Sequence, residues 1–187
     1  MGRLTITTPP IDEPISVAEA QAHLRVDSDD DAGLIQGLIT AAREYCEETQ
    51  GRSYVTRTYE YTVEPVRSID LPMPNHLTVE SVTAILSDGT SEELTSGDDY
   101  EVYVQLASDQ ARVRMLNYPA ETEALVIEYT AGYGTPQDVP QRIKQAMLML
   151  IGHWYEHRQT AEHGSQVREI PYAATALLML DTVEWGL

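Results

Sequence analysis

Apolar residues recur at helical spacing in two segments of the N-terminal part of the chain. Between residues 34 and 46, apolar side chains stand three and four positions apart, which predicts an amphipathic helix. Gly51 is a natural end for this helix, because glycine readily adopts the left-handed conformation that closes many helices. Residues 15 to 26 predict a shorter helix, in which Ser16 and Glu19 have the spacing of a capping box.

The hydrophobic period changes to two after these helices. Residues 55 to 64 alternate bulky side chains with Thr and Glu, which is the pattern of a half-buried strand. Asp88-Gly89 is a turn signal between two short runs and predicts a β-hairpin. Prolines on both sides of Ile69-Asp-Leu71 predict a loop there. An antiparallel β unit of about five or six strands is therefore expected, and its later strands are predicted at 79–86, 92–94, 100–106, 111–115 and 124–130.

A third amphipathic helix is predicted after Gly132-Tyr-Gly134, which marks the end of the β unit. Asp138 is placed to cap this helix, and Pro140 falls in its first turn, where a proline is tolerated. The helix is expected to run to about Arg158. One stripe along it holds Ile143, Met147, Leu150 and Trp154.

Helices at both ends of the chain, with strands between them, predict an α+β fold. A polar loop at 159–169 separates the third helix from a last one, expected from about residue 171 to 183. We expect a small helical bundle formed by residues 1–52 and 138–187, with an antiparallel β domain inserted at residues 53–137.

The charge balance narrows the classes of partner. Thirty acidic residues against twelve basic ones give a net charge of −18. Binding to duplex DNA or to anionic membranes depends on clusters of Lys and Arg, so the sequence argues against both. We expect no membrane span, because no run of 18 apolar residues occurs. The single cysteine, Cys46, excludes an internal disulfide, and a reducing cytoplasm is expected.

One catalytic motif stands in the third helix. His153-Trp-Tyr-Glu156-His157 is H-x-x-E-H, the inverted form of the zinc-protease helix motif. The two histidines flank the apolar stripe at i, i+4 spacing, so they can share a metal, but a catalytic zinc also needs a third protein ligand. Histidines at the edge of a packed helix are the simpler interpretation. The downstream candidates for a third ligand are Glu162, His163, Glu169 and Glu184.

Other catalytic and ligand-binding motifs are weak or missing in the sequence. The acidic run Asp27 to Asp31 fails as an EF-hand loop, because Ala32 stands where glycine is needed and Leu38 where glutamate is needed. The sequence contains neither a phosphate-binding P-loop nor a Gly-x-Ser-x-Gly nucleophile elbow. Cys46 lies on the apolar face of its helix and is interpreted as a buried small hydrophobe. No cofactor is expected.

The C-terminal segment, residues 172–187, is apolar almost to its last residue. Chain ends are normally polar and frayed unless something holds them. Two interpretations stay open: the segment packs back on its own body, or it docks on a partner, where a Trp is a typical anchor. The candidate partner-binding residues are Tyr172, Leu177, Leu178, Leu180, Val183, Trp185 and Leu187.

Several short motifs follow one another in a distinctive order. They include Pro14-Ile-Ser-Val-Ala-Glu-Ala-Gln-Ala-His-Leu-Arg-Val26, Thr130-Ala-Gly-Tyr-Gly134, Ile143-Lys-Gln-Ala146, His153-Trp-Tyr-Glu156 and Pro171-Tyr-Ala173. Each is weak alone, but their ordered combination resembles the head–tail connector (adaptor) proteins of tailed bacteriophages and phage-like gene transfer agents. The resemblance spans nearly the whole chain, although residues 65–125 match in kind rather than in letters.

The resemblance implies a structural virion protein without catalytic residues. Such connectors form a ring of about twelve subunits beneath the portal protein. The ring extends the DNA channel, through which genomic DNA passes without specific binding, and offers a surface to a head-completion (stopper) or tail protein. The C-terminal segment commonly engages the portal, and assembly takes place in the host cytoplasm. The alternatives are a zinc-dependent hydrolase using the H-x-x-E-H helix and a soluble monomeric or dimeric protein-binding module.

Overall fold

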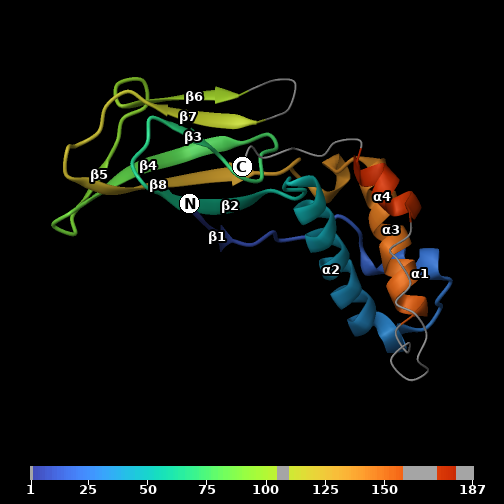
Figure 1. The fold of residues 1–187 in the computed structure, drawn as a ribbon. Coiled ribbons are helices and arrows are strands. Elements are labelled where there is room, and N and C mark those ends of the chain that lie inside the picture. Colours follow the sequence, from blue (N-terminus) through green and yellow to red (C-terminus); the bar gives the residue numbers. More distant parts are fainter. Residues whose placement is uncertain (1, 105–109, 158–171, 180–187) are drawn as a thin grey trace, which may run out of the picture. The chain divides into compact units, whose positions relative to one another are not determined.

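The computed structural model describes residues 2–104, 110–157 and 172–179, which form two compact units (Figure 1). The β unit contains the described residues 2–11 and 56–133, and the helical unit contains the described residues 12–55 and those from 134 onward. Among the described residues, no helix is both long and apolar enough to cross a membrane.

The helical unit follows the predicted pattern closely. Ser16 and Glu19 form the expected capping box, in which the Glu19 amide donates to Ser16 Oγ at 3.2 Å and the Ser16 amide donates to Glu19 Oε2 at 2.7 Å. Gly51 ends the second helix with a φ of 65°, in the left-handed region. The elements are α1 (Val17–Leu24), the 3-10 turn η1 (Asp29–Asp31), α2 (Ala32–Gln50), the 3-10 turn η2 (Pro136–Asp138), α3 (Gln141–Glu156) and α4 (Tyr172–Leu178).

The start of α3 differs from the prediction. Asp138 does not cap this helix; it closes the short η2 turn, where Thr135 N donates to its carboxylate at 2.8 Å. Pro140 stands at the N-cap of α3 and not in its first turn. The hydrogen bonds from Thr135 also hold the pKa of Asp138 below its ordinary value. Asp138 and Pro140, which both indicate a helix start, therefore belong to two consecutive elements, η2 and α3.

The β unit is a sandwich of two antiparallel sheets. One has five strands in the order β1-β2-β8-β4-β5, and the other has three in the order β3-β7-β6. The strands are β1 (Arg3–Thr8), β2 (Arg57–Val63), β3 (Ser68–Asp70), β4 (Thr78–Leu86), β5 (Ser91–Glu93), β6 (Tyr100–Val104), β7 (Ala111–Met115) and β8 (Thr122–Ala131).

Two of these strands correct the sequence prediction. β1 pairs antiparallel with β2, so residues 3–8 lie in the sheet and not in the helical body where we placed them. β3, expected as a loop between prolines, pairs with β7 through Ser68–Asp70. The described residues therefore hold eight strands where about five or six were expected. Both missed strands are edge strands, for which burial leaves the weakest pattern in the sequence.

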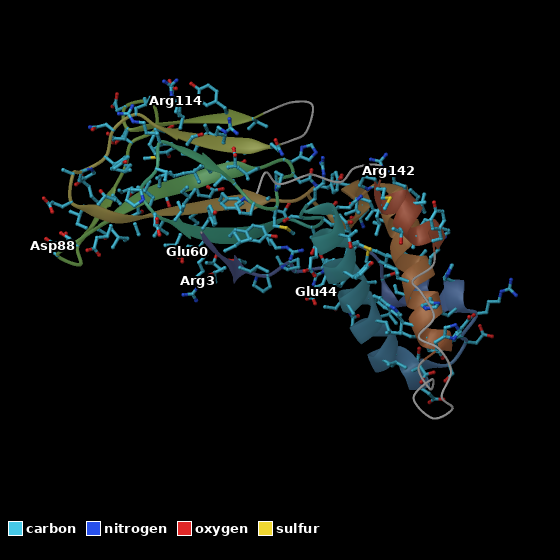
Figure 2. The ribbon with its side chains drawn as sticks, viewed as in Figure 1. Arg3, Glu44, Glu60, Asp88, Arg114 and Arg142 are labelled. Atoms are coloured by element: carbon cyan, nitrogen blue, oxygen red, sulfur yellow. The ribbon has the colours of Figure 1, made fainter. Side chains whose placement is uncertain are left out.

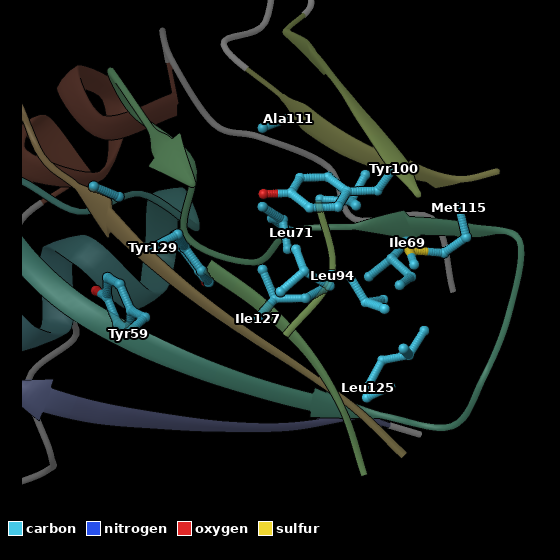
Figure 3. Close-up of a cluster of buried hydrophobic side chains, with 14 residues drawn as sticks. Tyr59, Ile69, Leu71, Leu94, Tyr100, Ala111, Met115, Leu125, Ile127 and Tyr129 are labelled. Atoms are coloured by element: carbon cyan, nitrogen blue, oxygen red, sulfur yellow. The ribbon is translucent and has the colours of Figure 1, made fainter. Parts of the chain in front are cut away.

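The core of the β unit lies between the two sheets (Figure 3). Leu125, Ile127 and Tyr129 point into it from β8, because successive strand residues face opposite sides of a sheet. Tyr129 stacks on Tyr59 with 5.3 Å between ring centroids, and its hydroxyl donates to the Pro72 carbonyl at 2.7 Å. Burial raises the pKa of the Tyr129 hydroxyl, so it stays a protonated donor.

Candidate functional site in the helical unit

The histidines of the H-x-x-E-H motif lie at the end of α3, as expected. Ile143, Met147 and Leu150 are buried, so the predicted stripe forms the packed face of this helix. Trp154 at the end of the stripe is only partly buried and meets Tyr45 of α2 edge-to-face at 6.2 Å. α2 and α3 therefore pack against each other within the helical unit.

The two histidines contact each other but bring no third ligand into place. The rings of His153 and His157 lie 4.7 Å apart, nearly perpendicular, and both are partly exposed. Within the part of the chain that the structure describes, no three His, Cys, Asp or Glu side chains gather closely enough to hold a metal ion. The four downstream candidates for a third ligand, Glu162, His163, Glu169 and Glu184, lie outside the described residues.

The acidic run between α1 and α2 makes structural hydrogen bonds. Ser28 caps the η1 turn through the Asp30 amide at 3.0 Å, and Asp29 accepts from Gln21 Nε2 at 3.2 Å. Asp31 accepts a hydrogen bond from the Tyr155 hydroxyl of α3. These carboxylates therefore connect α1, the start of α2 and the end of α3.

A buried ionic network fixes the middle of α2. Arg43 donates to Glu13 at 2.7 Å and to Glu47 at 2.8 Å, while the second carboxylate oxygen of Glu47 accepts from the Tyr54 amide at 2.8 Å. Burial by itself lowers the pKa of Arg43. The hydrogen bond to Glu13 and the charge of Glu47 outweigh burial and raise that pKa, so the guanidinium stays charged. Arg43 and Glu13 are 30 positions apart in the chain, so no local sequence pattern predicts this network.

Cys46 is buried next to this network, as predicted. Burial, helped by the charge of Glu47, raises the pKa of its thiol to about 12. The thiolate is the reactive form of cysteine, and at this pKa almost none is present at neutral pH. Cys46 is therefore a packing residue of α2.

The C-terminal helix α4 is held against α2 by a second polar contact. Gln50 is fully buried, and its side-chain nitrogen donates to the Leu178 carbonyl at 2.7 Å. The Tyr54 hydroxyl donates to the Gln50 oxygen at 2.6 Å and so fixes the orientation of the amide. Ala174 and Leu178 are buried on the same side of α4. The end of α4 is thus packed into the helical unit.

The sequence also matches a known family. A family model described as head completion protein matches residues 13–168, which is most of the chain. The chain belongs to the head completion protein family. The resemblance to head–tail connectors is therefore confirmed at the level of the family, and the chain is a structural head–tail protein of a phage-like particle.

Three solved structures share the fold of this head completion protein. The first is the neck of an empty gene transfer agent (GTA) particle computed with C6 symmetry: 18% identity, TM-score 0.78, covering 99% of this chain and 97% of that one. The second is the virion of a native GTA particle: 19% identity, TM-score 0.78, covering 98% and 97%. The third is the neck of a native GTA particle computed with C12 symmetry: 18% identity, TM-score 0.70, covering 97% and 98%. No curated protein gives a significant match.

The structure places three of the seven candidate partner-binding residues of this head completion protein. Tyr172 is 88% exposed at the start of α4, Leu177 is half-buried, and Leu178 is buried against the helical unit. Leu180, Val183, Trp185 and Leu187 lie outside the described residues. Tyr172, Leu177 and Leu178 all belong to α4. The sequence pattern does not predict that Gln50 and Tyr54 hold this helix in place.

Proposed function

We propose that the chain is the head–tail connector that forms a ring beneath the portal, extends the DNA channel and offers a docking surface to a stopper or tail protein. The observation that carries the proposal is the family match over residues 13–168. Two of the structures that share its fold come from necks computed with C6 and C12 symmetry, the symmetry of closed rings. We expect the ring, of about twelve copies, to assemble in the host cytoplasm and to function in the virion.

The proposed role needs no catalysis. The family is described as head completion protein, and the two histidines of α3 contact each other at the partly exposed end of the helix. Metal analysis of the purified chain is expected to find no stoichiometric zinc. Zinc at one equivalent, lost in the His157→Ala variant, would instead support the hydrolase alternative.

The charge of the chain suits a DNA channel. At −18 for each copy, a ring carries a strongly negative field, so DNA phosphates meet repulsion and not the Lys and Arg contacts that slow sliding. Glu60 and Glu128 stand directly opposite each other on β2 and β8. Their neighbours Tyr59 and Tyr129 point into the core, so the two glutamates lie on the face of the sheet that points away from it. Like charges opposite each other destabilise a sheet. Their presence favours an acidic wall, and a ring with a basic lumen would contradict it.

The C-terminal segment is the proposed contact with the portal. Buried Leu178 fixes the end of α4, while Tyr172 and Met179 expose most of their side chains. The apolar residues that follow, Leu180, Val183, Trp185 and Leu187, continue beyond this fixed end. A large aromatic residue in such a segment is a typical anchor for a partner pocket.

Portal binding with truncated chains tests this proposal. The truncation should remove only residues 180–187, because removing α4 as well takes buried Leu178 out of the core. Loss of a Trp anchor costs at least about 2 kcal/mol, so binding to the purified portal is expected to weaken roughly 30-fold or more. The Tyr172→Ala variant should weaken binding less, and Leu34→Ala, an exposed apolar position on α2, is the matched control.

Two outcomes of the portal-binding experiment separate the alternatives. Unchanged portal binding by the truncated chain would assign the C-terminal segment to another role. No binding by the full chain would favour the soluble binding module. Mass measurement of the free chain does not decide between them, since a connector can stay monomeric until it meets the portal.

A further inference from the structure

The two sheets of the β sandwich are offset at the β1 edge. Leu4 and Ile6 lie opposite Tyr61 and Tyr59 in the sheet register, so they are on the face that looks into the core. Tyr59 is only 2% exposed, yet Leu4 is 36% and Ile6 47% exposed. The three-stranded sheet therefore ends before it covers β1. We call Leu4 and Ile6 the β1 overhang.

The β6 edge carries the opposite offset. Val102 and Val104 lie opposite Val113 and Ala111 of β7, both of which are buried in the core. Val102 is nevertheless 37% and Val104 46% exposed, on the same inward-looking face of the three-stranded sheet. At this edge the three-stranded sheet extends past the five-stranded sheet that covers it. We call these two valines the β6 overhang.

An open groove accompanies the β1 overhang. It has a volume of about 490 Å³ and lies between β1, β2 and β3, with Leu4, Tyr61, Val63, Ile69 and Met73 among its lining residues. A groove of this volume is large enough for several apolar side chains. It is the space that a strand in the layer of β3 would fill if the small sheet continued over β1.

The two edges also differ in charge. The stretch from β5 to the end of β6, residues 91–104, contains five acidic residues and no basic one. β1 (Arg3–Thr8) contains Arg3 as its one charged residue (Figure 2). Two β6 edges brought together would repel each other, as like charges across an interface do, whereas a β6 edge facing a β1 edge would not.

We propose that neighbouring copies of this chain join in the ring by an overlap of these two edges. The β6 overhang of one copy lies on the β1 overhang and groove of the next, so that the sandwich core continues from subunit to subunit. The contact joins two different surfaces, and such head-to-tail contacts generate rings when the rotation closes. This inference rests on the ring of the proposed function and names the surfaces that build it.

Covering the overhangs also explains why they are apolar. A long exposed edge strand with apolar side chains promotes uncontrolled pairing, and proteins usually protect it with charges or a covering element. β1 has six exposed residues with Arg3 as the only charge among them. A neighbouring subunit supplies the missing cover.

Cross-linking within assembled rings tests the pairing. In a Cys46→Ala background, Ile6→Cys and Val104→Cys are made as separate chains and co-expressed, singly or mixed, with the portal. After a ring is seen by electron microscopy, a short bis-maleimide is added. We expect cross-linked dimers only in the mixed rings. Dimers in rings of Ile6→Cys alone, or none in mixed rings, would overturn the overlap.

Charged substitutions give an independent readout. Ile6→Asp and Val104→Asp are expected to reduce ring assembly on the portal at least tenfold, because each buries a carboxylate in the overlap. Both sites are exposed in the single chain, so the thermal midpoint should shift by only a few degrees. Leu116→Asp, at a site 40% exposed outside both overhangs, is the control. Normal rings with either variant contradict this interface, whereas absence of rings from the unaltered chain contradicts the proposed function.

Discussion

Replacing Arg43 by methionine is expected to destabilise the chain by about 3–5 kcal/mol, measured as the free energy of unfolding in urea. Arg43 and Glu47 are both nearly inaccessible to solvent, with 6% and 3% of their side chains exposed. Methionine keeps much of the volume of the arginine but removes the charge. The carboxylates of Glu47 and Glu13 then stay in a poorly solvated place without the guanidinium that faces both of them.

A double variant separates the charge effect from packing. Arg43→Met combined with Glu47→Gln removes the buried negative charge and keeps an oxygen that can accept from the Tyr54 amide. We expect the double variant to be less destabilised than Arg43→Met alone. The coupling energy between the two substitutions should be about 0.5–3 kcal/mol. If Arg43→Met lowers the free energy of unfolding by less than about 1 kcal/mol, the network contributes no more to stability than an exposed ion pair does.

The helical unit could be predicted well because its signals are local. The capping box of Ser16 and Glu19 and the left-handed Gly51 act within a few residues of the positions they define. The apolar stripe of α3 was likewise visible as a period. The prediction of where α3 starts was wrong because Asp138 and Pro140 are both typical of a helix start. Only the structure shows that Asp138 belongs to the separate η2 turn.

The candidate site could be predicted only in part, because its contacts join distant parts of the chain. Gln50 and Leu178 are 128 positions apart, and no local pattern links a glutamine at a helix end to a carbonyl in the last helix. The apolar character of the C-terminal segment was evident, but not which residue fixes α4. In the same way, the alternation of Leu4 and Ile6 with threonines is visible in the sequence. Their exposure, however, follows from the different numbers of strands in the two sheets, which leave β1 uncovered.

Leu71 gives the sharpest test of the segment where the pattern of prolines was misleading. It follows directly after β3, is fully buried in the core between the sheets, and its amide donates to the Ala111 carbonyl at 2.9 Å (Figure 3). Leu71→Ala removes buried methyl groups and leaves a cavity that the two sheets can only partly close. The expected loss is about 2–5 kcal/mol in the free energy of unfolding, measured in urea.

Val66→Ala is the matched control for this substitution. Val66 belongs to the same proline-rich segment but is 41% exposed, so its truncation should change the free energy of unfolding by no more than about 0.5 kcal/mol. A surface loop would make the two variants alike. If Leu71→Ala also costs less than about 0.5 kcal/mol, the segment does not contribute to the core, and the groove between β1 and β3 loses its fixed wall. A large difference instead means that the chain directly after β3 is part of the core between the two sheets, as the burial of Leu71 indicates.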